Sequence, residues 1–444
     1  MSSGLAERRG AHGPRIRLSV MMFIEFFIWG AWLPLIFGYL PQLGFNAEWQ
    51  QPLILGAFNL AAFTAMFFST QFADRHFAAE RFLAFSHLIG GAAMLALAWV
   101  TDFWLFFTLM LVHSLFYVPT ISITNSIAFA NLKDPQRDFG YIRLWGTIGW
   151  IAASWPFVFV LADWDKVPPF AQAGFGDWLL AILGNSKQDA AFREATKYTF
   201  VVAGLASLLL AGFSLFLPHT PPRRAEEGVE RFAWLEAMKL LRVPYILVLF
   251  IVTFIDAAVH QCYFFWAERY LTSGVQIPAN WVMPVMSVGQ IAEILTMALL
   301  GLVLSRLGWK YTMIIGVLGH AARFLVFAWF PIPWVAISIN VLHGICYAFF
   351  FATVYIFVDE FFPKDARASA QGLFNFLILG LGPFVGNFLS ARLGMWFETS
   401  KDHWDFNMMF RYPAGAAVLA ALILLLLFWP PKSKEVNDPR TGTF

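Results

Sequence analysis

Charged side chains are scarce in this sequence. Lys, Arg, Asp and Glu together make up 13% of its 444 residues, whereas about a quarter is usual in soluble domains. Hydrophobic residues make up 59%, and the mean hydropathy is +0.64. This composition excludes an ordinary soluble protein and indicates a chain that crosses a membrane many times.

Cysteine and the common catalytic motifs are lacking as well. Only Cys262 and Cys346 occur, both inside apolar runs, so there is neither a disulfide framework nor a Cys-x-x-Cys pair for metal or redox chemistry. The sequence also has no glycine-rich phosphate-binding loop, no zinc-protease helix motif and no serine-nucleophile motif. We therefore expect no enzymatic activity, no metal and no cofactor, and any transport would use an ion gradient or run downhill.

Long apolar runs are what the sequence does contain. At 1.5 Å per residue, about 20 residues of helix cross a bilayer core of roughly 30 Å. The first run is too long for a signal peptide and lacks a small-residue cleavage site, so we interpret it as a retained span. The predicted spans lie at about 18–40, 52–72, 82–100, 103–127, 142–162, 198–217, 244–271, 282–304, 310–330, 333–358, 368–390 and 409–430. The sequence thus predicts an all-α membrane protein with twelve transmembrane helices.

The basic residues indicate an orientation. Most of the Lys and Arg residues fall in or beside cytoplasmic segments when the N-terminus is placed in the cytoplasm, in agreement with the positive-inside rule. We therefore predict a multi-pass protein of the cell inner membrane with both termini in the cytoplasm. The outer loop at 163–197 is long and mixed in composition, and we expect it to carry a short surface helix.

A charged segment at 218–243 divides the spans six and six, which predicts an N-terminal half at 1–217 and a C-terminal half at 244–444. Ala73-Asp74-Arg75 follows the second span, and a basic loop at 305–310 follows the eighth. Two six-helix halves that rock about a midplane cavity are a common construction for secondary transporters. The Asp-Arg loop is a degraded form of a major facilitator superfamily signature, so the chain resembles that superfamily, although ordinary positive-inside charge also explains the loop.

Glu293 is the only ionisable side chain between Trp281 and Leu304, near the middle of a predicted span. An acid at that depth costs roughly 2.5 to 3.5 kcal/mol on insertion scales, so it is expected to serve a function. Gln290 precedes it by three positions and shares its helix face. Interhelical hydrogen bonding is the structural alternative for the glutamine.

The fifth predicted span carries a polar face of its own. Arg143, Thr147 and Trp150 are spaced to place a guanidinium, a hydroxyl and an indole along one side of a helix. Gly146 and Gly149 leave room for a neighbouring helix to approach closely. Arg143 is also explained by snorkelling from the cytoplasmic end of the span.

Polar residues recur in later spans. Asp256 and His260 lie one turn apart in the seventh span, which favours a structural polar pair, and Gln261 follows them. In the tenth span, His343 and Tyr347 form a further polar face together with Asn340.

Two charged residues lie inside other spans. We hypothesise that Glu25, in the first span, is a second candidate for binding a proton. For Arg323, in the ninth span, we expect snorkelling to the outer surface or a structural pairing.

Taken together, these residues resemble one family, the bacterial nucleoside:proton symporters of the major facilitator superfamily. The matching stretches occur in order along both halves. They are Phe26–Trp32 (FFIWGAW), Phe116–Thr120 (FYVPT), Arg143–Gly149 (RLWGTIG), Ser287–Glu293 (SVGQIAE) and Arg367–Gly372 (RASAQG). The resemblance implies a central site that holds a nucleoside between the halves, with proton symport driving uptake.

The resemblance also implies roles for single residues. Positions that match residues contacting substrate in the family are Arg143, Thr147, Gln261, Gln290 and Glu293. Trp150 stands where the family has a Phe that stacks on the base. Amides suit a base edge, and a carboxylate suits ribose hydroxyls as an acceptor.

Two positions depart from the family pattern. Phe264 stands where the family has an Asn, and Ala348 stands where it has an acid. The exact substrate and the number of protons therefore remain open. The aromatic residues Phe264 and Tyr347 join the expected substrate site, and the candidates for proton coupling are Glu293, Glu25 and His343.

The leading hypothesis is a proton-coupled nucleoside importer. Its expected partners are a nucleoside, protons and the lipid bilayer, with no nucleic acid, and we expect a monomer. One alternative is a coupled or uncoupled transporter of another polar solute, such as a purine derivative or a sugar. Another is a non-transporting membrane sensor of the same fold, and an integral membrane enzyme is disfavoured because no catalytic set shares a face.

Overall fold

The computed structural model describes residues 2–64, 77–132, 135–222, 238–362, 367–400 and 403–430, with the backbone alone described for 2–13, 135–137 and 367–369. The loop Ala73-Asp74-Arg75, most of the predicted linker and the C-terminal tail from 431 lie outside the described residues. The side chains of Arg367, Ala368 and Ser369 lie outside them too.

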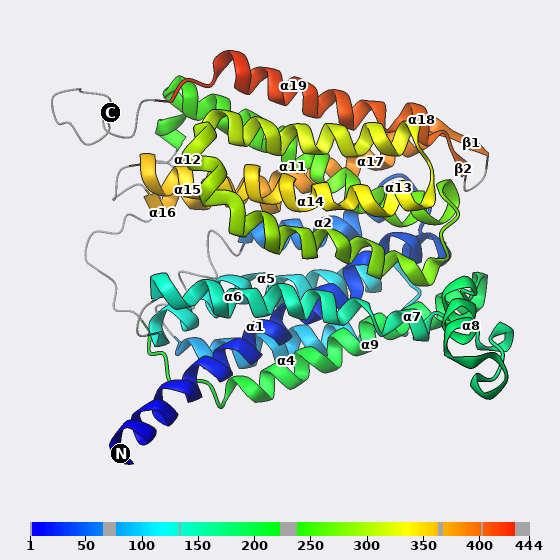
Figure 1. The fold of residues 1–444 in the computed structure, drawn as a ribbon, viewed down its shortest axis with the longest axis horizontal. Helices are drawn as coiled ribbons and strands as arrows, with labels where there is room; N and C mark the ends of the chain where they lie inside the picture. The colour runs from blue at the N-terminus through cyan, green and yellow to red at the C-terminus, as the bar shows by residue number, and fades with distance from the viewer. Residues whose placement is uncertain are drawn as a thin grey trace. The chain divides into compact units, whose positions relative to one another are not determined.

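Nearly all of the described chain is helical (Figure 1). The helices before the linker are α1 (Ser2–Gln42), α2 (Gln50–Thr64), α4 (Ala79–Leu97), α5 (Phe103–Asn131), α6 (Pro135–Ser154), α7 (Phe157–Val160), α8 (Phe170–Gly184) and α9 (Asp189–Ser214). Those after it are α11 (Pro244–Arg269), α12 (Val282–Trp329), α13 (Pro333–Ser338), α14 (Leu342–Cys346), α15 (Thr353–Phe361), α16 (Arg367–Asn375), α17 (Gly382–Phe397), α18 (Phe406–Met409) and α19 (Arg411–Leu427).

Short π-helical turns interrupt the later helices, at Tyr270–Gly274, Tyr347–Ala352 and Phe376–Leu381. A small antiparallel ribbon of β1 (Glu398–Ser400) and β2 (His403–Trp404) is the one difference in class from the all-α prediction among the described residues.

Nine segments of the described chain are long and apolar enough to cross a membrane. One of them, Ala279–Trp329, is 51 residues long and contains two helices, because Gly308 breaks the helical backbone at φ 71°. A positive φ is open to glycine at little cost, so this residue separates the two predicted spans at 282–304 and 310–330. A nearly all-helical membrane protein is confirmed, while the count of twelve stays a prediction.

Local sequence signals set several helix boundaries. Asp102 caps α5, since its carboxylate accepts a hydrogen bond from the Leu105 backbone N–H at 2.9 Å. Asp405 caps α18 in the same way through Met408, at 3.1 Å. Pro333 occupies the first turn of α13, where the missing N–H costs nothing.

The chain divides into two compact units. Unit 1 comprises Met1–Ala225 and Trp266–Ser287, and unit 2 comprises Glu226–Phe265 and Val288–Phe444. The end of α11 and the start of α12 therefore belong with unit 1. The predicted halves at 1–217 and 244–444 remain a proposal.

Within unit 1, glycines allow α1 and α6 to pack closely. A Cβ at Gly149 would overlap the backbone of Phe23, and one at Gly30 would lie 2.8 Å from the Trp150 carbonyl oxygen. A Cβ at Gly146 would meet the Phe26 ring at 2.6 Å. The expected close approach at Gly146 and Gly149 is confirmed, and it fixes the polar face of α6 against α1.

Within unit 2, glycines play the same part for α12 and α14. A Cβ at Gly289 would lie 2.8 Å from the His343 Cβ, and one at Gly344 would overlap the backbone of Glu293. This close approach places His343 beside the face of α12 that carries Gln290. On α17, a Cβ at Gly386 would lie 2.8 Å from the Ala258 carbonyl oxygen of α11.

The segment at 163–197 in unit 1 carries α8, in which Ile182 is the only buried residue, so the expected surface helix is confirmed. An isolated antiparallel bridge joins Ala162 to Ser186 at its base. The Asn280 amide donates to the carbonyl of Ile182 at 3.0 Å, which connects the later segment of unit 1, Trp266–Ser287, to this loop.

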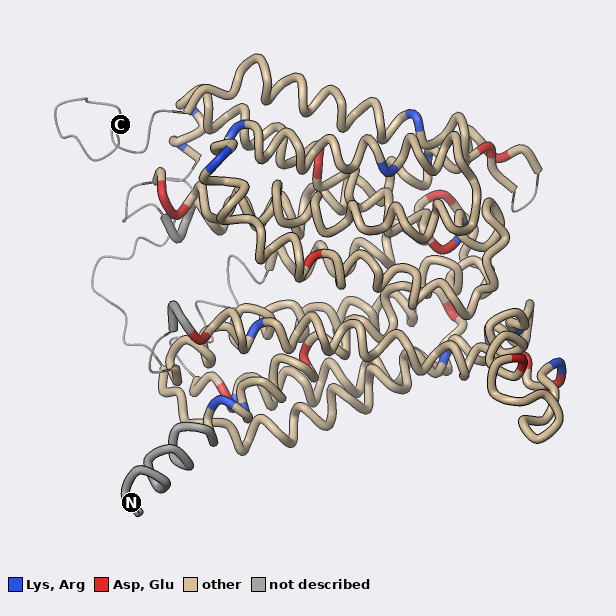
Figure 2. Tube along the Cα trace, viewed as in Figure 1, with Lys and Arg blue, Asp and Glu red and all other residues tan. Residues whose placement is uncertain are grey.

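Charges on the described helices gather mainly near the helix ends (Figure 2). Among the Asp, Glu, Lys and Arg side chains described, three are exceptions with no exposed surface, namely Glu25, Asp256 and Arg323. Each lies inside a candidate span. Because burying an uncompensated charge is costly, the partners of these three residues define where to look for function.

Candidate functional site

The polar face of α6 lies against aromatic residues of α1. The Arg143 guanidinium sits over the Phe26 ring at 4.0 Å from its centroid, a cation–π contact. The Trp150 indole meets Trp29 edge-on at 5.4 Å. Arg143, Thr147 and Trp150 are all half-buried, so each keeps part of its surface available.

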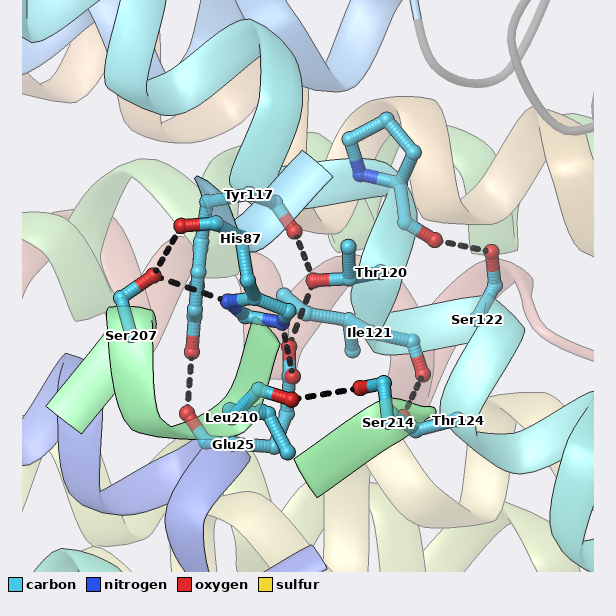
Figure 3. A network of polar contacts seen from close by, with 11 residues as sticks. Glu25, His87, Tyr117, Thr120, Ile121, Ser122, Thr124, Ser207, Leu210 and Ser214 are labelled. Carbon is cyan, nitrogen blue, oxygen red and sulfur yellow. Dashed lines mark hydrogen bonds and ion pairs between the residues drawn. The ribbon is translucent and has the colours of Figure 1, made fainter. Parts of the chain in front are cut away.

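A second polar cluster of unit 1 surrounds Glu25 (Figure 3). His87 Nε2 of α4 lies 2.8 Å from Glu25 Oε2, and the Thr120 hydroxyl of α5 donates to Oε1 at 2.7 Å. The Tyr117 hydroxyl donates to the Glu25 backbone carbonyl at 2.7 Å. Both Glu25 and His87 are buried, so this carboxyl group contacts protein partners in place of water.

Helix α9 completes the cluster through Ser207. His87 Nδ1 lies 2.9 Å from the Ser207 hydroxyl oxygen, and that hydroxyl donates to the His87 backbone carbonyl at 3.1 Å. In Figure 3, His87 lies between Ser207 and Glu25. Beside them, His113 stacks on Tyr117 at 5.2 Å and its Nδ1 bonds the Gly90 carbonyl. Residues from four helices therefore meet around one buried acid.

In unit 2, His343 links the predicted substrate face of α12 to a buried arginine. An Arg323 N–H donates to His343 Nδ1 at 3.1 Å, so the proton of a neutral His343 is on Nε2. The amide nitrogen assigned to Gln290 lies 3.4 Å from that Nε2, while its Oε1 has no partner among the described residues. Two donors facing each other indicate a flipped amide, and after the flip Nε2–H donates to Oε1.

Arg323 does not snorkel. Its side chain has no exposed surface, and its guanidinium lies 3.7 Å from the Tyr263 ring centroid. The Tyr263 hydroxyl in turn donates to Asn340 Oδ1 at 2.7 Å. The expectation of snorkelling is wrong and that of a structural pairing is confirmed, because the aromatic ring and His343 provide partners inside the unit.

Asp256 and His260 are connected through a third residue. His320 of α12 lies with Nδ1 2.9 Å from Asp256 Oδ1 and with Nε2 3.0 Å from His260 Nδ1. His260 then stacks on His343 at 5.0 Å. The sequence contained a signal for this series of contacts, since His320 and Arg323 lie three positions apart on one face of an otherwise apolar span.

The remaining predicted residues of α11 lie beside this network. The Gln261 amide donates to Asn387 Oδ1 of α17 at 2.8 Å. The Phe264 ring meets His260 and His343 edge-on at 5.3 and 5.6 Å. The aromatic ring of Phe264 therefore occupies the position where the family has an Asn side chain.

In the tenth predicted span, Tyr347 and Ala348 lie in different surroundings. Tyr347 is half-buried and begins the π-helical turn Tyr347–Ala352. Ala348 is fully buried in an apolar cluster with Leu300, Phe349 and Ala352. An acid at Ala348 would thus have met hydrocarbon side chains in this conformation.

Glu293 is half-buried on α12, and its backbone faces Gly344 of α14. The structure brings Gln290, His343 and Phe264 into one network of unit 2. On unit 1 it brings Arg143 and Trp150 against α1.

A cavity in the described chain has a volume of about 660 Å³ and contains none of the predicted substrate residues. It lies between α1 and α6 of unit 1 and is lined by residues such as Phe23, Tyr141 and Trp145. We give the polar faces more weight than this cavity, because its lining is mainly apolar and its two charged residues, Arg15 and Asp138, pair with each other.

Buried acid–histidine contacts inside membrane-spanning helices are typical of sites that move protons or substrates, as in secondary transporters. Comparison with known families makes this specific. The model of the nucleoside H+ symporter family matches residues 13–173 and 170–433. The chain belongs to this family of transporters, and it is not an enzyme.

Individual relatives agree with the family. The chain is 32% identical over 436 residues to a putative nucleoside transporter, YegT, of Escherichia coli K12, with 95% of each chain covered. It is 26% identical over 443 residues to the xanthosine permease of the same organism, covering 96% of this chain and 97% of the permease. A crystal structure of a mutant of the nucleoside transporter NupG has a TM-score of 0.79 and 25% identity, covering 94% of this chain and 100% of that one. The fold is that of the major facilitator superfamily.

Proposed function

We infer that this protein is a secondary active transporter that imports nucleosides by proton symport. The observation that carries this conclusion is the match to the nucleoside H+ symporter family along almost the whole chain. The relatives' printed functions point the same way, since they include a putative nucleoside transporter and a xanthosine permease.

The proposed nucleoside-binding residues come from both units. They are Arg143, Thr147 and Trp150 of unit 1, and Gln261, Phe264, Gln290, Glu293 and Tyr347 of unit 2. Their chemistry supports the proposal, because amides pair with base edges, an indole stacks on a base, and a carboxylate accepts from ribose hydroxyls. The side chains of Arg143, Thr147, Trp150, Gln261, Phe264, Glu293 and Tyr347 are half-buried, as residues that receive a ligand should be.

Proton coupling is proposed for Glu293, Glu25 or His343. Burial of Glu25 and His343 supports a role in which protonation and transport are linked. Phe264 and Ala348 stand where the family has an amide and an acid. We therefore propose that the nucleoside preference and the number of protons differ from those of relatives.

The finer architecture belongs to the same proposal. We propose twelve spans in two six-helix halves, which are the nine candidate spans with Ala279–Trp329 counted as two and with α2 and α6 added. Alternating access would then proceed by rocking of the halves. We further propose an inner-membrane location, cytoplasmic termini and a monomer.

Reconstituted protein provides the test. In proteoliposomes preloaded with unlabelled uridine or adenosine, we expect counterflow of the labelled nucleoside and accumulation under an inward proton gradient. Free bases and sugars should compete poorly. The proposal would be overturned if no nucleoside showed counterflow and no nucleoside competed. Competition by sugars alone would favour a transporter of another solute. Binding without counterflow would favour a sensor.

A further inference from the structure

Each unit contains a buried acid–histidine pair, made through Nε2 of the histidine in unit 1 and through Nδ1 in unit 2. In unit 1, Glu25 of α1 pairs with His87 of α4, and in unit 2, Asp256 of α11 pairs with His320 of α12, at 2.8 and 2.9 Å. A second histidine follows on a later helix of each unit, His113 and His343. Counterparts in the two units are separated by a nearly constant interval in the sequence, as an internal repeat requires.

The hydrogen bonds of the first pair require a proton. The single Ser207 hydroxyl hydrogen is directed to the His87 carbonyl, so His87 Nδ1 must carry the hydrogen that reaches the Ser207 oxygen. A neutral His87 then has a bare Nε2, yet that atom lies 2.8 Å from Glu25 Oε2. A hydrogen is needed between these two acceptors, so the contacts of His87 with Ser207 and with Glu25 are satisfied together only when the pair holds one proton.

The second pair needs no such proton. His320 Nδ1–H donates to the Asp256 carboxylate, and His260 Nδ1–H donates to His320 Nε2. His343 Nδ1 accepts from Arg323. Every one of these contacts is made with Asp256 ionised and all three histidines neutral.

Charge balance separates the pairs in the same way. Around Asp256 the neighbouring ionisable groups are those of α11 (His260, Cys262 and Tyr263), α12 (His320 and Arg323) and α14 (His343 and Cys346). Arg323 interacts electrostatically with Asp256, although the two form no ion pair among the described residues, so the second pair has a buried positive charge nearby.

Around Glu25 the corresponding groups are His87 of α4, His113 and Tyr117 of α5, and Arg143 of α6. Within the described residues no Lys or Arg forms an ion pair with Glu25, and Arg143 is placed over Phe26. Only a bound proton makes this pair neutral.

We propose that the Glu25–His87 pair is the site that carries the transported proton, and that in its repeat, Asp256–His320, the Arg323 guanidinium takes the place of that proton. The proposal rests on the proton symport proposed above and adds which residues hold the proton and how many are carried. One proton binds the Glu25–His87 pair from the outer side and neutralises it. The same proton leaves to the cytoplasm, and each cycle moves one proton with one nucleoside.

Two variants in proteoliposomes test this assignment. Glu25→Gln keeps the size and a neutral side chain, and we expect it to retain nucleoside counterflow within about twofold of the original protein while losing gradient-driven accumulation completely. Asp256→Asn is the matched control from the repeated pair, and it should still accumulate nucleoside under a proton gradient. Accumulation by Glu25→Gln at the level of the original protein would overturn the assignment.

A measurement on the unaltered protein covers the case in which a variant does not fold. A pH-sensitive dye inside the vesicles, read together with labelled nucleoside, gives the protons moved per nucleoside. We expect one, and two would overturn the statement that only one of the pairs carries a proton. If the unaltered protein shows no counterflow, the proposed function fails, whereas normal uptake with two protons or with an active Glu25→Gln variant fails only this inference.

Discussion

His87 Nε2 lies 2.8 Å from Glu25 Oε2, and at most 1% of either side chain is exposed. An ion pair or a shared proton at such a place has lost the water that would otherwise stabilise it. The hydrogen bonds to Thr120 and Ser207 therefore take the place of water around the pair. Several expectations about variants follow from this contact and from the packing around it.

Thr120→Val should weaken gradient-driven accumulation of nucleoside. The substitution keeps the side-chain shape and removes the hydroxyl that donates to Glu25 Oε1. Without this hydrogen bond the carboxyl group is held less firmly opposite His87 Nε2, the contact to which we assign the transported proton. Accumulation of labelled nucleoside in proteoliposomes under a proton gradient measures the effect. Unchanged accumulation would mean that the hydroxyl donates to the Tyr117 carbonyl instead, the other acceptor within its reach.

Arg323→Met should destabilise the protein. It removes a fully buried charge that bonds His343 and lies over Tyr263, and it leaves Asp256 without its offsetting charge. Breaking a buried charged network in this way costs about 3 to 5 kcal/mol, and thermal unfolding in detergent should show the loss as a lowered Tm.

The control for Arg323→Met is Arg411→Gln, at an exposed position where the guanidinium bonds Asn407. Exposed substitutions of this kind usually change stability by about 0.5 kcal/mol or less. Equal unfolding temperatures for the two variants would contradict the role assigned to Arg323.

Gly149→Ala should disrupt the packing of α1 on α6. The added Cβ would overlap the Phe23 backbone, which cannot move aside as a flexible side chain can. Overpacking of a close contact costs typically about 1 to 3 kcal/mol, and the variant should unfold at a lower temperature.

Gly140→Ala is the matched control on the same helix. Nothing lies within 4 Å of its added Cβ, and alanine favours a helix over glycine by about 0.8 to 1 kcal/mol. Its unfolding temperature should stay the same or rise. A similar loss of stability in both variants would show that helix propensity, and not the contact with Phe23, controls the result.

Arg143→Lys should weaken nucleoside binding while preserving charge. A lysine has no planar group to lie over Phe26 or to present two parallel donors to a ligand. We expect the Kd for nucleoside to rise about tenfold, which corresponds to about 1.4 kcal/mol, in a titration of ligand-induced thermal stabilisation. The same Kd in both proteins would assign Arg143 to the helix contact alone.

Much of the helical structure could be predicted because apolar run length follows directly from the physics of a bilayer. The spacing of Arg143, Thr147 and Trp150 along α6 also followed from helix geometry. The contact of His87 with Glu25 could not be predicted, since two helices distant in the sequence meet there. Hydropathy says that a span is apolar, but it does not say which face packs against which neighbour.

Arg323 illustrates the same limit. From the sequence, a charge in an apolar span favoured snorkelling to the membrane surface. In the structure, Tyr263 and His343 from other helices contact the Arg323 guanidinium. The link between Asp256 and His260 through His320 was likewise hidden, because helix periodicity reports only neighbours on the same helix. The residue spacing within a single helix does not predict cation–π contacts or hydrogen bonds to another helix.

The division of α11 has a consequence for the order of synthesis. Unit 1 includes Trp266–Ser287, which the ribosome makes only after it has made the first segment of unit 2. Domains usually fold as they emerge, N-terminal parts first. Here the N-terminal unit has to wait for a later stretch of chain, so nascent chains arrested before Trp266 should remain more sensitive to protease than chains arrested after Ser287.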